Sequence, residues 1–322
     1  MHYGLLDDTP SGQWQPDVLA GFSRRSIPLG EDAEGPLSAT LVRHDASAGS
    51  PVLYLHGWSD YFYNTELAEA VAHRGYTFYA LDLRKYGRSL RSKQSPGYIE
   101  DLAQYDQEID AALAILNSVH PGRKPAMIAH STGGLIAALW AHRHPEQLST
   151  LVLNAPWLTL QGNSWLRGFA NTVVDPLWRS MPERKLLLPK LDFFYRTISS
   201  NEHGDWVLHP IWRPRFSFDI QAGWLSAILD GHTQVRHGLA IDVPVLVLTS
   251  TKTHFAAKYS AKMQAADSVL DVHETAKYAV KLGNTVMLHK IPDAIHDVYA
   301  SAHPVRDSAF HATVQWLDYF IH

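Results

Sequence analysis

The sequence contains no cysteine among its 322 residues, which excludes disulfides, a thiolate nucleophile and thiolate metal ligands. It also has no block of Lys or Arg, and its formal net charge is −4. A nucleic acid or an anionic membrane surface is therefore not expected as a partner. No Gly-rich phosphate motif of the G-x-G-x-x-G or P-loop type occurs, so we expect no nucleotide and no other cofactor.

Long hydrophobic runs are also missing. No apolar run approaches the ~20 residues of a membrane-spanning helix, and residues 1–17 lack the basic and then apolar pattern of a secretory signal. We therefore expect no membrane insertion and a cytoplasmic location. The pair His142 and His144 precedes Pro145 at an expected helix end, and we interpret it as a solvated terminus without a metal. The sequence does not indicate an oligomeric state.

Short apolar runs alternate with segments of helical periodicity. Strands are predicted over residues 38–44, 51–56, 76–83, 125–130, 149–155, 242–250 and 284–291, and helices over 65–73, 100–119, 132–143 and 304–321. This alternation predicts an α/β fold with a mostly parallel central sheet flanked by helices.

One region interrupts the alternation. Residues 157–240 are irregular and rich in Pro, and they hold six of the ten tryptophans, Trp157, Trp165, Trp178, Trp206, Trp212 and Trp224. So many large aromatic residues argue against disorder. We predict a helical cap, or lid, over 157–240, inserted into a core made of residues 1–156 and 241–322.

Ser131 stands in the run Ala-His-Ser-Thr-Gly, between a predicted strand and a predicted helix. This context is typical of the G-x-S-x-G turn, in which small flanking residues let strand and helix pass closely and expose the serine hydroxyl. Ala129 replaces the first Gly, and Gly133 supplies the second. The alternative is a serine that only caps the helix. The placement favours a nucleophile.

With this turn and the expected cap, three further motifs make the chain resemble the α/β-hydrolase superfamily. They are "LHGWSD" after an early strand, "LDLRKYGRS" with Lys85 where a Gly usually stands, and "HD" after the last strand. Within the superfamily the chain is similar to the monoacylglycerol lipase and lysophospholipase-like, serine aminopeptidase-type branch. The resemblance implies a serine hydrolase with a cap domain.

An oxyanion hole follows from the resemblance. Acyl transfer needs preorganised N–H donors at the developing oxyanion. One is expected from Thr132, directly after the nucleophile, and the resemblance implies that Trp58, after His56 and Gly57, supplies the other. His56 is then structural. In the second motif, Asp82, Arg84 and Arg88 are expected to brace the loop after their strand and to take no part in the chemistry.

The general base is expected to be His296. Histidine titrates near neutrality, and in this superfamily the base lies in a loop after the last strand, where the sequence places His296. His289 falls inside the predicted strand, and His303 falls at the start of the last helix.

The acid that orients the histidine has the weakest signal. The turn after the strand over 242–250 contains no carboxylate before Asp267. The resemblance of "DSVLD" to a family segment implies Asp267 as the acid, after a longer loop than usual. Asp271 is the alternative, and both could be solvated loop residues.

These residues predict a serine hydrolase, and the family resemblance implies that it is an esterase of the carboxylesterase or lipase-like class. It would act through an acyl-enzyme on a mid-sized apolar ester or lactone, such as a monoacylglycerol or a lysophospholipid. An aminopeptidase of the same branch is the alternative; it would need cap carboxylates to bind an amine, and the candidates are Glu183, Glu202, Asp205 and Asp219. A third possibility is an inactive hydrolase fold that serves as a ligand receptor.

Overall fold

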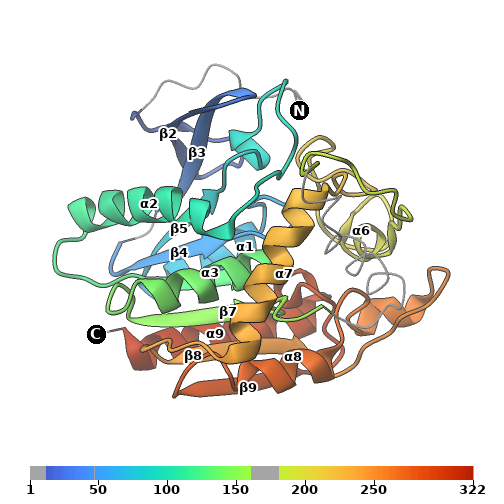
Figure 1. The fold of residues 1–322 in the computed structure, drawn as a ribbon. Helices are drawn as coiled ribbons and strands as arrows, with labels where there is room; N and C mark the ends of the chain where they lie inside the picture. The colour runs from blue at the N-terminus through green and yellow to red at the C-terminus, as the bar shows by residue number, and fades with distance from the viewer. Residues whose placement is uncertain (1–11, 47, 161–180, 322) are drawn as a thin grey trace.

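A nine-stranded sheet forms the centre of the molecule in a computed structural model that describes residues 12–46, 48–160 and 181–321. Its strands are β1 (Gln15–Pro16), β2 (Phe22–Asp32), β3 (Gly35–His44), β4 (Pro51–Leu55), β5 (Thr77–Asp82), β6 (Ala126–His130), β7 (Thr150–Asn154), β8 (Val245–Ser250) and β9 (Val286–Ile291). Their spatial order is β1-β2-β3-β5-β4-β6-β7-β8-β9. In Figure 1, β2 and β3 stand at the top and β9 lies at the bottom.

The sheet is antiparallel at one end and parallel elsewhere. β1, β2, β3 and β5 pair antiparallel, whereas the ladder from β5 through β4, β6, β7 and β8 to β9 is parallel. Parallel strands bring their carboxyl ends to one edge of the sheet, which is where ligand sites of open α/β sheets form. The predicted, mostly parallel sheet is confirmed.

Helices cover both faces because the strands are apolar on both sides. In β4, Leu53 and Leu55 join one buried cluster, while Val52 and Tyr54 join the other. Within the described ranges the helices are α1 (Thr65–His73), α2 (Asp106–Val119), α3 (Thr132–Arg143), α6 (Phe193–Ile198), α7 (Ala222–His237), α8 (Val272–Ala279) and α9 (His303–Phe320). α1 and α9 contribute to the cluster with Val52, and α2, α3 and α7 to the cluster with Leu53.

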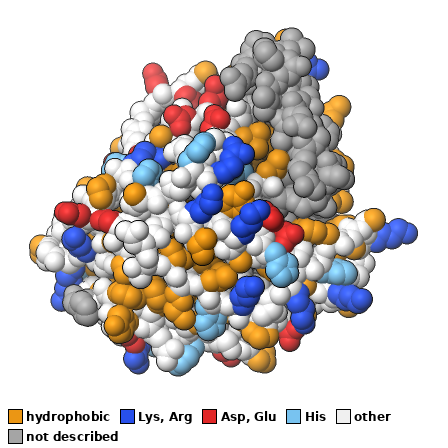
Figure 2. Space-filling model, turned by 60° about the horizontal axis from the view of Figure 1, so that its bottom comes forward, with side chains coloured by type: hydrophobic (Ala, Val, Ile, Leu, Met, Phe, Trp, Pro, Cys, Tyr) orange, Lys and Arg blue, Asp and Glu red, His pale blue; other side chains and the backbone are white. Residues whose placement is uncertain are grey.

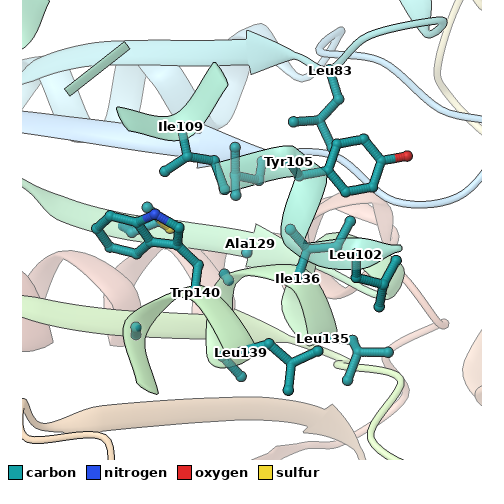
Figure 3. Close-up of a cluster of buried hydrophobic side chains, with 14 of the residues drawn as sticks. Leu83, Leu102, Tyr105, Ile109, Ala129, Leu135, Ile136, Leu139 and Trp140 are labelled. Atoms are coloured by element: carbon teal, nitrogen blue, oxygen red, sulfur yellow. The ribbon is translucent and has the colours of Figure 1, made fainter. Parts of the chain in front are cut away.

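The cluster on the α3 side has large side chains that fix the helices in place. Figure 3 shows Ile109 of α2 and Trp140 of α3 with Tyr105 and Leu102 of the preceding 3₁₀ turn. Trp140 is fully buried, and its indole N–H donates to Asp110 Oδ1 at 2.9 Å. A buried tryptophan thus has its polar atom satisfied, and α3 is held firmly behind the end of β6.

Most predicted elements are confirmed, some with shifted ends. The helices over 65–73 and 132–143 have the predicted bounds, whereas the one over 100–119 begins as a 3₁₀ turn, Leu102–Tyr105, before α2. β2 and α8 were not predicted from the sequence. Pro28 lies inside β2, and a proline argues against a strand unless, as here, the strand is near an edge of the sheet.

The region of the predicted cap contains α6 and α7 in its described part, and Trp165 and Trp178 lie outside the described residues. α7 packs along α3: Ile228 and Leu225 of α7 belong to the same buried cluster as Leu135 and Leu139 of α3. α6 and the loops around it lie beyond one end of the sheet, to the right in Figure 1. The division into core and cap remains a prediction.

The surface mixes charge signs. On the face drawn in Figure 2, Lys, Arg and His side chains lie among hydrophobic ones, and Asp and Glu are scattered between them. Among the residues that the structure describes, no helix is both long enough and apolar enough to cross a bilayer.

Candidate active site

Ser131 occupies a strained turn between β6 and α3. Its φ of 52° and ψ of −115° lie in a region that a residue with a Cβ rarely adopts. Its N–H donates to Asn154 O at 3.0 Å, and its C=O accepts from Trp157 N at 3.0 Å. Next to it, a Cβ on Gly133 would lie 2.2 Å from His56 O. The glycine is therefore required for the close approach of α3 to the end of β4.

Three of the predicted side chains form a hydrogen-bonded series. His296 Nε2 lies 3.0 Å from Ser131 Oγ, and His296 Nδ1 lies 3.0 Å from Asp267 Oδ2. A carboxylate can only accept, so Nδ1 carries the proton and Nε2 is free to accept from the serine hydroxyl. Asp267 and His296 are each 1% exposed and Ser131 is 8% exposed. This arrangement has the geometry of an activated nucleophile.

Asp267 reaches the histidine because the chain returns to the end of β8. Thr253 and Asp267 form an isolated parallel bridge, in which Asp267 N donates to Lys252 O at 2.9 Å and His254 N donates to Asp267 O at 2.8 Å. Asp267 Oδ1 accepts from Val269 N at 2.8 Å and from Leu270 N at 2.7 Å. One carboxylate oxygen thus fixes the loop and the other faces His296.

The alternative acid has a different position. Asp271 is the N-cap of α8, and its side chain accepts from His273 N and Glu274 N. An aspartate at an N-cap satisfies backbone donors of the first helical turn. The structure therefore brings Asp267, and not Asp271, into contact with His296.

The other histidines weighed in the sequence lie away from Ser131. His289 is in β9, and His303 begins α9 near Glu66 and Asp307. In the His142 and His144 pair, each ring has its own partner: His142 Nδ1 accepts from Ala240 N, and His144 Nε2 lies 3.0 Å from Asp106 Oδ2. Within the described ranges, no group of three or more His, Asp or Glu side chains is placed to hold a metal ion.

The two residues expected to supply the oxyanion donors, Trp58 and Thr132, line the same cavity as Ser131. Thr132 is the first residue of α3, so its N–H has no acceptor within the helix. Trp58 follows Gly57, where a Cβ would come within 3.2 Å of Ser131 Cβ. His56 is committed to the backbone: Nε2 accepts from Leu83 N at 3.1 Å, and Nδ1 donates to Gly57 O at 2.8 Å.

The residues of the "LDLRKYGRS" run hold the loop after β5. Asp82 accepts from Phe62 N at 3.0 Å and from Arg88 N at 2.9 Å, and it forms a fully buried ion pair with Arg88. Arg84 pairs with buried Glu108 of α2 through both carboxylate oxygens. These contacts hold the three charged residues in the loop after β5, as expected from the sequence.

Ser131 and Thr132 line a cavity of about 320 Å³. Most of the other lining side chains are apolar, and they include Trp58, Trp157, Leu188, Phe194, Phe218 and Trp224. Phe194 of α6 also meets the His296 ring edge to face, with ring centroids 5.0 Å apart. A mostly apolar cavity with a few polar groups in its lining is the usual form of a site for a small, largely apolar ligand.

Several buried polar residues near the site gave no signal in the sequence. Asn154, at the end of β7, donates to Asp297 Oδ1 at 2.6 Å and accepts from Val298 N at 3.1 Å, which fixes the loop that carries His296. His130 donates from Nδ1 to Asn154 O at 3.2 Å, and its burial lowers its pKa. Such contacts join distant segments, so no local motif marks them.

Of the acidic residues considered for amine binding, Glu202 and Asp205 pair with arginines, and Asp219 alone is among the cavity-lining residues. Asp205 pairs with Arg306, and Glu202 pairs with Arg215 and Arg196. Asp219 lines the cavity and pairs with Lys185 and Lys190.

Comparison with known proteins gives a family and a set of distant relatives. The family described as serine aminopeptidase, S33 matches residues 46–298. Lysophospholipase L2 of Escherichia coli (strain K12) is 34% identical over 102 residues, which are 28% of this chain and 27% of that protein. Monoacylglycerol lipase of Mycolicibacterium smegmatis is 26% identical over 113 residues, which are 35% of this chain and 39% of that protein.

A solved structure extends the likeness to the whole fold. A soluble variant of monoglyceride lipase from Saccharomyces cerevisiae superposes with a TM-score of 0.65 at 16% identity, covering 100% of this chain and 98% of that one. The matches to the two curated relatives span only 27% and 39% of those proteins. The family match, by contrast, covers most of the chain and all the residues of the hydrogen-bonded series. The chain therefore belongs to the serine aminopeptidase, S33 family of α/β-hydrolases.

Proposed function

We propose that the protein is a serine hydrolase that cleaves carboxylic esters through an acyl-enzyme. The observation that carries the proposal is the series Ser131 Oγ, His296 Nε2, His296 Nδ1 and Asp267 Oδ2, with both contacts at 3.0 Å. A serine hydroxyl becomes a nucleophile when a neutral imidazole takes its proton and a carboxylate holds the imidazole in the right tautomer.

In the first step Ser131 Oγ attacks the ester carbonyl carbon, and its proton passes to His296 Nε2. The carbonyl oxygen takes the negative charge and is stabilised by the N–H groups of Trp58 and Thr132. Collapse of this intermediate expels the alcohol, which receives the proton from His296. Water then attacks the acyl-enzyme by the same route and releases the acid.

The apolar cavity supports an acyl chain as the group that is bound. Aromatic and aliphatic side chains surround Ser131, and their burial of methylene groups favours binding by about 0.8 kcal/mol for each CH₂. We infer that the substrates are mid-sized apolar esters of the monoacylglycerol or lysophospholipid kind. The names of the relatives from Escherichia coli and Mycolicibacterium smegmatis agree with this class.

The test is a series of p-nitrophenyl esters graded by acyl length, with Ser131→Ala as the control. We expect the wild-type protein to hydrolyse these esters. We also expect a fluorophosphonate probe to label Ser131. Hydrolysis of aminoacyl anilides in preference to esters would support the aminopeptidase instead. Absence of both hydrolysis and labelling would favour a receptor, and either result would overturn the proposal.

A further inference from the structure

The turn that carries Trp58 is held by unusual contacts. Gly57 N donates to Asp60 Oδ2 at 3.3 Å across the turn. Ser59 is buried and has a φ of 50°, a left-handed conformation that a residue with a Cβ adopts only at an energetic cost. Such a conformation persists only where surrounding contacts impose it. The direction of the Trp58 N–H therefore depends on what holds Ser59 and Asp60.

Those contacts come from a segment more than 150 residues away in the sequence. Arg213 Nη1 forms an ion pair with Asp60 Oδ1, with the two side chains 6% and 2% exposed. Phe218 N donates to Ser59 Oγ at 3.1 Å. Burial alone would raise the pKa of Asp60, but the neighbouring Arg213 guanidinium keeps that pKa below its ordinary value. The carboxylate thus remains charged, with one oxygen on Arg213 and the other on the Gly57 N–H.

Arg213 also touches the opposite wall of the site. Its guanidinium lies over the ring of Phe194, 5.1 Å from the centroid, and that ring is the one that contacts His296. Its own backbone is fixed, because Arg213 N donates to His209 O at 2.9 Å. One buried side chain therefore connects the 209–218 segment with both the Trp58 turn and the aromatic wall of the cavity.

We propose that Arg213 is a positioning residue, which acts through Asp60 to hold the Trp58 N–H at the place where the oxyanion forms. The inference rests on the proposed ester hydrolysis. Without Arg213, Asp60 would be a buried carboxylate with an unpaired oxygen, and it would rotate or take up a proton. The Gly57 hydrogen bond would then weaken and the turn would relax. A displacement of about 1 Å in such a group lowers the rate roughly 10²-fold.

The variants are Arg213→Met and Asp60→Asn, with Arg306→Met as the matched control. Arg306 is a second buried arginine that ties the same region to the core, through Asp205 and Glu66, but it does not contact the Trp58 turn. Each variant is assayed for kcat and KM on p-nitrophenyl butyrate and for inhibition by an alkyl trifluoromethyl ketone. In that adduct the Ser131 oxygen bonds to the carbonyl carbon, His296 takes the proton, and the ketone oxygen becomes an oxyanion.

We expect Arg213→Met and Asp60→Asn to lower kcat about 10- to 100-fold, with KM within about twofold of the wild type. The affinity for the ketone should fall by a similar factor, and Arg213→Lys should restore part of both. Arg306→Met should change neither by more than about twofold, although it lowers the melting temperature.

Several results would overturn the inference. Equal kinetic effects in the Arg213 and Arg306 variants would show that Arg213 stabilises the fold and does not position the Trp58 N–H. Loss of folding in both Arg213→Met and Asp60→Asn, seen in thermal melts, would lead to the same conclusion. Failure of the proposed function is a separate result, because it would appear as an inactive wild-type protein. If the wild type is active and Ser131→Ala is not, the variants test Arg213 alone.

Discussion

Replacing Asp267 by Asn should disable the base while leaving the loop intact. Asp267 Oδ1 accepts from the N–H groups of Val269 and Leu270, and the amide oxygen of Asn can keep both bonds. The amide NH₂ would then face His296 Nδ1 in place of Oδ2. Because an NH₂ group donates, Nδ1 would have to accept, and the ring proton would move to Nε2. The imidazole would then point a proton at Ser131 and could not act as its base.

The expected size of the effect follows from this tautomer. The corresponding substitution in a serine protease lowers kcat by about 10⁴, which is about 5 kcal/mol in the activation barrier. Asp271→Ala is the control, because Asp271 caps α8 through His273 N and Glu274 N. Loss of an N-cap lowers the free energy of unfolding by about 1 kcal/mol, and kcat should stay within about twofold.

The assay compares kcat on p-nitrophenyl butyrate with the free energy of unfolding from urea denaturation. Asp267→Asn should lose activity and unfold at nearly the wild-type urea concentration, whereas Asp271→Ala should show the reverse. A kcat for Asp267→Asn within tenfold of the wild type would refute the assignment of the acid. Severe loss in Asp271→Ala at unchanged stability would move the role to Asp271.

Three further substitutions test other parts of the site. Gly133→Ala would place a Cβ 2.2 Å from His56 O, and we expect a lower melting temperature and loss of fluorophosphonate labelling; full labelling would contradict the close approach. Burial lowers the pKa of His232 to about 4, so from about pH 6.5 to 4 the unfolded chain binds one more proton and stability falls as the pH falls. His232→Gln can still donate to Trp157 O and should remove up to about 3 kcal/mol of that loss in the free energy of unfolding. The measurement is urea denaturation at a series of pH values, and an unchanged dependence of the unfolding free energy on pH would exclude His232 as its source. Leu188→Trp should fill part of the cavity and lower kcat/KM for long acyl esters while butyrate esters react as before; an equal loss for all chain lengths would place the acyl chain elsewhere.

The local pattern was sufficient to locate Ser131, which follows a continuous apolar run and precedes small residues. His296 follows the last such run, but the chain has 19 histidines, and the choice among them also rested on the order of residues that the family resemblance implies. The parallel ladder then brings both to one edge of the sheet. Arg213 and Asn154 carry no such mark, because their partners lie in other segments.

Each element that the sequence did not locate also has a physical explanation. β2 has only a partly alternating burial pattern, and it contains Pro28, so its sequence resembles a loop. α8 has eight residues, which is short for recognition by periodicity, and its start depends on the Asp271 side chain. α7 lies among the aromatic residues that suggested an insertion, yet Ile228 packs in the same cluster as α3. Its burial against the core is set by tertiary contacts that composition does not encode.

The long loop between β8 and Asp267 is possible because the free energy of closing a loop rises only slowly with its length. Doubling the length of a flexible loop adds only about 0.6 kcal/mol to its closure, whereas a misplaced acid would lose most of the rate. The two ends of the loop over 254–266 are held together by the parallel bridge between Thr253 and Asp267, which lies just beyond the end of β8. Thr253 Oγ1 also donates to Leu270 O at 3.1 Å and accepts from Val272 N at 2.9 Å. The fold therefore fixes Asp267, the proposed acid, by its register beside the strand end, and the length of the loop before it can change without moving it in space.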